Sequence, residues 1–180
     1  RRSGDSTVLW TMDSLTYYYY EGTNQLKYVH DGSASGNYNV DIDNQTDTNN
    51  YVYDAIGNLT GDDAEGIQKI KWNVYGKIES IKFTGASGKP DLVFGYDAMG
   101  NRISKKVMPQ SAGDTITTYY VRDATGNTMA TYLRKGYTAS DTLRLSEQHI
   151  YGSSRLGMVS TSLLLSEQLD TSNIYTRLLG

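Results

Sequence analysis

Apolar and polar residues alternate with a period of two along several short segments of the chain. The clearest segments are residues 70–74, 92–96, 103–107 and 129–133. This alternation predicts β-strands with one half-buried face each. Residues 84–91 and 109–114, which separate some of these segments, are rich in Gly, Ser, Asp or Pro and contain both prolines of the chain. They are predicted to be loops that join strands.

A short motif recurs beside these segments, at the opposite end from the loops. Two copies read Tyr-Asp-x-x-Gly-Asn, a third has Arg in place of Tyr, and a fourth is degraded to Trp-Asn-Val-Tyr-Gly-Lys. The four glycines are 19, 24 and 26 residues apart. A fixed motif at a variable step predicts consecutive hairpins whose far loops differ in length. The motif residues are Tyr53, Asp54, Gly57, Asn58, Gly76, Tyr96, Asp97, Gly100, Asn101, Asp123, Gly126 and Asn127.

The residue types of the motif suit a tight turn. A type I turn favours Asp at its first position, where the carboxylate accepts a hydrogen bond from the backbone N–H two residues on. Gly then takes a left-handed conformation and forms a bulge that matches the turn to twisted strands, and Asn bonds the neighbouring backbone. The Tyr before the Asp is expected to cover the turn with its ring. The motif is therefore predicted to be structural.

Three regions follow from the same patterns. Residues 1–50 contain a possible strand–turn–strand at 17–29 and a polar stretch at 31–50 that is predicted to be mostly loop. Residues 51–135 hold the repeats. Residues 136–180 contain a further hairpin at 148–158 with a different turn. The fold class predicted from these regions is all-β, built of consecutive antiparallel hairpins.

Composition changes this picture in one respect. Leu, Ile, Val and Phe together make up only about a fifth of the chain, which is little for a compact core, and Tyr supplies 16 residues. Tyr is favoured in strands where one side stays wet, so the counts disfavour a helical bundle and fit a single-layer sheet wall. The net charge of −3 and the pI near 5.3 provide no basic footprint for a nucleic acid partner.

Several classes of site are excluded by residue counts. The chain has no Cys and only two His, His30 and His149, which excludes thiolate chemistry and a multi-histidine metal site within this sequence. The longest purely apolar run, residues 163–165, is far too short to cross a membrane. No targeting signal precedes Arg1, so the chain is expected to be cut from something longer or processed.

The remaining candidate chemistry is weighed residue by residue. Asp54, Asp97 and Asp123 occupy the same position in three repeats, whereas acid–base catalysis needs carboxylates in different environments. His149 is expected to be a packed or edge residue of a strand, because no nucleophile constellation surrounds it. Residues 85–89 lack the full spacing of a phosphate loop. The chain is therefore predicted to be non-enzymatic, with no catalytic residue and no cofactor.

A calcium site is a weaker possibility in the polar stretch. Asp41, Asp43, Gln45 and Asp47 alternate, but an EF-hand loop starting there would have Thr46 and Val52 where it needs Gly and Glu. A solvated loop is the preferred interpretation, and no metal site is predicted.

The repeated Tyr-Asp-x-x-Gly-Asn motif resembles the YD repeat of the Rhs (rearrangement hotspot) family. Residues 149–158, with Tyr-Gly-Ser-Ser-Arg-Leu-Gly, resemble the stretch before the Rhs repeat-associated core in proteins of the Bacteroidota. The resemblance covers residues 51 to about 159. It implies a strand that zigzags through hairpins and spirals into a hollow β shell, which encloses a C-terminal toxin in toxin complexes and forms part of an adhesion receptor in teneurins.

The resemblance sets the expected function. The chain would be a structural wall segment of a large secreted or surface-exposed bacterial protein, and its partner would be the rest of the same polypeptide. A secretion apparatus and surface glycans are further partners that the resemblance allows. Members of the family often have a self-cleaving core with Asp-Pro motifs. Autoproteolysis is not expected of this sequence, because it contains no Asp-Pro dipeptide. The alternative is a cell-surface adhesion or carbohydrate-binding module that uses a Tyr-rich face.

Overall fold

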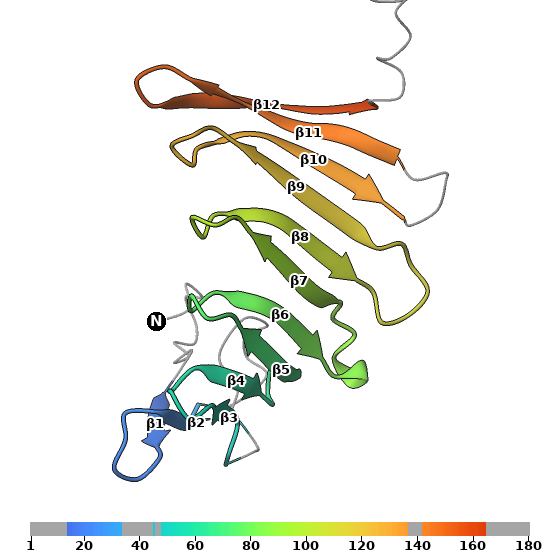
Figure 1. Ribbon diagram of the computed structural model, residues 1–180. Coiled ribbons are helices and arrows are strands. Elements are labelled where there is room, and N and C mark those ends of the chain that lie inside the picture. Colours follow the sequence, from blue (N-terminus) through green and yellow to red (C-terminus); the bar gives the residue numbers. More distant parts are fainter. Residues whose placement is uncertain (1–13, 34–44, 46–47, 137–141, 165–180) are drawn as a thin grey trace, which may run out of the picture. The chain divides into compact units, whose positions relative to one another are not determined.

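The computed structural model describes residues 14–33, 45, 48–136 and 142–164, and these form antiparallel β-strands with one short 3₁₀ turn (Figure 1). The chain packs as two units, residues 1–71 and 72–180. The strands are β1 (Leu15–Tyr19), β2 (Leu26–Asp31), β3 (Tyr51–Tyr53), β4 (Leu59–Asp62), β5 (Ile67–Trp72), β6 (Ile78–Phe83), β7 (Asp91–Tyr96), β8 (Arg102–Met108), β9 (Ile116–Arg122), β10 (Thr128–Lys135), β11 (Thr142–Tyr151) and β12 (Arg155–Leu164).

The first unit contains two sets of paired strands. β1 pairs with β2, and β4 pairs with both β3 and β5, in each case antiparallel. Val29 of β2 and Ile70 of β5 are the buried apolar residues among the described part of this unit, at 3% and 6% exposure. The predicted strand–turn–strand at residues 17–29 is present as β1 and β2.

The second unit is a succession of hairpins from β6 to β12, in which each strand pairs with the next along the chain. The hairpin predicted at residues 148–158 is part of β11 and β12. Of the two predicted loops, residues 84–90 contain the 3₁₀ turn Gly85–Ser87, and residues 109–115 join β8 to β9. The predicted fold class of consecutive antiparallel hairpins is confirmed.

The second unit has no apolar core in the part that the structure describes. Its buried residues there are Thr115 and Thr131, and large apolar side chains such as Val121, Ile150 and Val159 are 46–51% exposed. Most of the other strand side chains are half-buried. The hydrogen-bonded ladders of a single sheet therefore hold this unit together more than side-chain burial does.

No helix within the described ranges is long and apolar enough to cross a membrane.

Candidate functional site

The turn motif uses its Asp side chain to close each hairpin. At Asp97, Oδ1 accepts hydrogen bonds from the backbone N–H groups of Met99 and Asn101 at 2.9 and 2.8 Å, and Oδ2 accepts one from the Asn101 amide at 3.0 Å. The backbone N–H of Gly100 donates to the Asp97 carbonyl, and that of Asp97 donates to the Asn101 carbonyl, both at 3.0 Å. Both carboxylate oxygens are thus engaged within the turn.

The same network recurs at the other two clean copies. Asp54 accepts from the N–H groups of Ile56 and Asn58 and from the Asn58 amide at 2.8–3.1 Å, and Asp123 has the equivalent contacts at 2.8–3.0 Å. In the degraded copy, Asn73 Oδ1 accepts from the N–H groups of Tyr75 and Lys77 at 3.0 Å. The backbone part of the network survives there, while Lys77 replaces the Asn that would donate from its side chain.

The glycine of the motif has a conformation that other residues avoid. Gly100 has a φ of +80°, and Gly57, Gly76 and Gly126 share the positive sign. A Cβ atom added at Gly100 would meet only the Lys77 side chain, at 3.8 Å, so space does not require glycine there. The backbone angle itself requires it.

These contacts lower the pKa values of the three turn carboxyl groups. For Asp97 and Asp123 the main cause is the hydrogen bond from the following Asn amide, and the pKa of Asp123 falls to about 2. For Asp54, partial desolvation acts upward, but the hydrogen bonds from Asn58 and the turn backbone outweigh it, so its pKa is also lowered. All three groups are therefore ionised near neutral pH, and none is tuned toward neutral pH as a general acid would be.

A tyrosine before three of the turns reaches back to the preceding hairpin, which the motif alone did not reveal. The hydroxyl groups of Tyr53, Tyr96 and Tyr151 donate to the carbonyls of Leu26, Ile78 and Thr128 at 3.1, 2.8 and 2.9 Å. Each acceptor lies at the start of the strand that follows an earlier turn. We call these contacts the hairpin links. That the Tyr ring covers its own turn stays a prediction, while its hydroxyl joins two successive hairpins.

One hairpin link is made by an arginine. Arg122 Nε donates to the Arg102 carbonyl at 3.1 Å, and its Nη1 donates to the Gly126 carbonyl at 2.7 Å. The link position therefore tolerates a change of residue type as long as a donor reaches the carbonyl. The sequence signal for these links is that Tyr53 and Tyr96 recur at a fixed offset from the turn.

The other candidate residues lie apart from the turns. Asp41, Asp43 and Asp47 fall outside the described residues. Gln45 uses its side chain within the protein, because Oε1 accepts from the Val29 N–H at 2.8 Å and Nε2 donates to the Tyr51 hydroxyl at 2.9 Å. Within the described ranges no group of three or more acidic or histidine residues could hold a metal ion.

His149 lies on β11 with its side chain 7% exposed. Neither ring nitrogen has a hydrogen-bond partner, and Nε2 lies 3.7 Å from the Glu147 carboxylate. The ring of Tyr151 is 6.4 Å away between centroids. The low exposure of the side chain fits the expected packed histidine.

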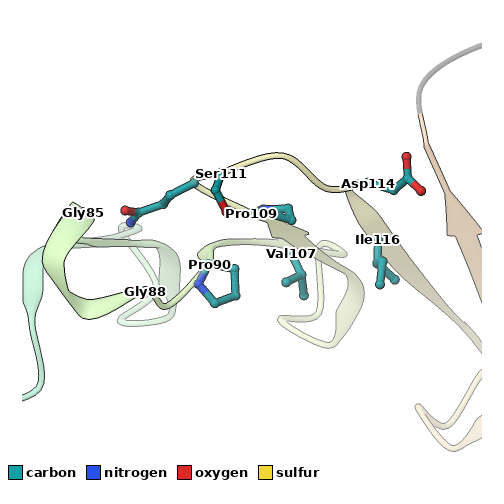
Figure 2. A pocket seen from close by; sticks show the side chains of 9 residues that line it. Gly85, Gly88, Pro90, Val107, Pro109, Ser111, Asp114 and Ile116 are labelled. Atoms are coloured by element: carbon teal, nitrogen blue, oxygen red, sulfur yellow. The ribbon is translucent and has the colours of Figure 1, made fainter.

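A hollow of about 400 Å³ lies at the loop ends of β6–β9 (Figure 2). Pro90, Val107, Pro109 and Ile116 supply apolar surface to it. Its one carboxylate, Asp114, forms an ion pair with Lys135 at 3.3 Å. The carboxylate of the hollow is therefore already paired within the protein.

Neither a family model nor a curated protein matches the chain.

Proposed function

We propose that this chain is a non-enzymatic wall segment of a larger secreted or surface-exposed Rhs/YD-repeat protein, whose β shell encloses another part of the same polypeptide. The single observation that carries the proposal is the second unit, which is a one-layer succession of hairpins without an apolar core among its described residues. A globular domain buries apolar side chains between two layers, whereas a wall needs side chains that tolerate half-burial on both faces.

The turn chemistry supports the same proposal. The turn carboxylates accept hydrogen bonds that close their own hairpins. The hydroxyl groups of Tyr53, Tyr96 and Tyr151 donate the hydrogen bonds that link a hairpin to the one before it. Their side chains therefore have a complete role in building the wall. The mechanism would be mechanical, since a continuous hydrogen-bonded sheet excludes proteases and other proteins from what it encloses.

A comparison of unfolding transitions tests the proposal. A wall segment depends on its neighbours for stability, as repeat modules do. We therefore expect the 180-residue chain alone to unfold in a broad transition at low temperature, and the same chain extended by the flanking segments of its reading frame to unfold cooperatively at a higher temperature. A sharp, high transition of the chain alone, unchanged by the extension, would refute the wall function.

A further inference from the structure

The repeats provide an internal standard for what the wall itself requires. The residue before a turn is Tyr at positions 53, 96 and 151, and the residue whose carbonyl it bonds is Leu26, Ile78 or Thr128, all uncharged. The residue after the turn glycine is Asn at 58, 101 and 127. A positive charge at these positions is not needed to close the turns or to form a link, because uncharged residues do so in the other copies.

Three basic departures meet in one place. Lys77 stands where the clean copies have Asn, Arg102 stands where the other links have an uncharged residue, and Arg122 stands where they have Tyr. All three line a groove of about 380 Å³ at the turn ends of the second unit, together with Tyr96, Gly100, Asn101 and Tyr120. Three positions that are uncharged in the other repeats are thus positively charged here, and all three lie in one groove. This indicates that the groove has a role besides folding.

The positive charge of the three cations is not neutralised by a direct ion pair within the described ranges, although Arg122 donates through Nε and Nη1 to the carbonyls of Arg102 and Gly126. The guanidinium carbon of Arg102 lies over the Phe94 ring, 4.5 Å from its centroid, and a guanidinium in such a cation–π contact keeps its charge. Arg122 contributes to the lowered pKa of Asp97, but Asn101 and the turn backbone already hold that carboxylate.

We infer that this groove binds the carboxylate side chains of an acidic, extended peptide segment. Arginine donates to a carboxylate through two parallel N–H groups, which suits the side chains of Asp and Glu. Arg102 begins β8 and Arg122 ends the neighbouring β9, and adjacent strands are about 4.8 Å apart. In an extended peptide, side chains at every second residue lie on one side about 6.7 Å apart, so two such carboxylates reach neighbouring cations.

The surroundings favour a short acidic peptide over a long polyanion. The turn carboxylates of Asp97 and Asp123 are ionised near the groove, and the whole chain carries a net charge of −3. The phosphates of a nucleic acid would extend beyond the groove and be repelled by these carboxylates, whereas two or three peptide carboxylates fit within the groove.

The test compares two charge-matched variants of the full chain. The groove variant returns each departure to the residue type found elsewhere in the repeats, as K77N, R102I and R122Y. Because those residues occupy the equivalent positions in other copies, the variant is expected to keep its turns and its link. The control variant removes three cations outside the groove, as K82T, K105T and R155T. Both variants lose the same charge.

The probe is a short fluorescein-labelled peptide with Glu at every second position, measured by fluorescence anisotropy at about 10 mM salt, where the Debye length is roughly 30 Å. We expect the parent to bind it, to ignore the same peptide with Gln in place of Glu, and to lose binding at high salt. The groove variant should weaken the Kd by at least about tenfold, equivalent to roughly 1.4 kcal/mol, and the control variant by far less.

Three outcomes would overturn the inference. The first is that the parent does not bind the Glu peptide. The second is an equal loss in both variants, which would show that only the overall charge matters. The third is groove-dependent binding of an oligo-uronate in place of the peptide, which would assign the groove to an acidic glycan. None of these results bears on the wall function, because the support for the wall is the one-layer sheet, the turn carboxylates and the Tyr links, and not the charge of these three cations.

Discussion

Replacing Gly100 by Val tests whether the turn backbone determines hairpin stability. Gly100 has a φ of +80°, and an L-residue in this region costs about 1–2 kcal/mol. Because only the flexible end of Lys77 lies near the added Cβ, the loss comes from the backbone and not from a clash. For a chain of this length each kcal/mol lowers the melting temperature by about 2–4 °C.

Gly157→Val is the matched control. Gly157 lies within β12, has no positive φ, and nothing lies within 4 Å of an added Cβ. Val is favoured in strands, so this variant should be neutral or more stable. The assay is urea unfolding followed by circular dichroism, with hydrogen exchange of the Asp97 amide, which donates to the Asn101 carbonyl, as a local probe. Equal free energies of unfolding for the two variants would refute the turn argument.

Three further predictions follow from individual side chains. Tyr96→Phe should lower the free energy of unfolding by about 1 kcal/mol, because its hydroxyl loses the hydrogen bond to the Ile78 carbonyl. The control Tyr119→Phe, at an exposed ring, should change the free energy little. Equal urea midpoints for the two variants would show that the Tyr96 link does not stabilise the sheet. The turn carboxyl groups have lowered pKa values in the folded state, so their contribution to the free energy of unfolding is present above pH about 4 and is lost as the pH falls toward about 2. Asp123→Asn should therefore reduce the dependence of the free energy of unfolding on pH in this window. An unchanged pH dependence would contradict this prediction. His149→Phe should raise the free energy of unfolding by about 1 kcal/mol, because it removes two nitrogens that lack hydrogen bonds from a mostly buried position. A decrease in the urea midpoint would show that the 3.7 Å contact of Nε2 with Glu147 stabilises the fold instead.

The hairpins could be predicted from the sequence because their determinants are local. Alternation along residues 92–96 and 103–107 defines two strands, and Asp97 and Gly100 between them define the turn. Both the acceptor and the donors of the turn network lie within five consecutive residues. A pattern that closes within so few residues needs no knowledge of the rest of the fold.

The hairpin links and the basic groove could not be predicted in the same way. The acceptor of the Tyr96 hydroxyl, the Ile78 carbonyl, is 18 residues away across a loop. Which carbonyl it meets depends on how far successive hairpins are offset, and the motif does not encode that offset. Likewise Lys77, Arg102 and Arg122 are separated by loops of different length, so their meeting in one groove follows only from the register of β6–β9.

The hairpin links have a consequence for how such a chain can change in length during evolution. Each link joins a turn region only to the one before it, over sequence separations of 18 to 27 residues. Duplicating or deleting one whole hairpin between two linked turns therefore leaves a donor opposite a strand-start carbonyl at the new junction. Unequal recombination within the gene can lengthen or shorten the sheet without a compensating mutation elsewhere, because no link depends on the total number of hairpins.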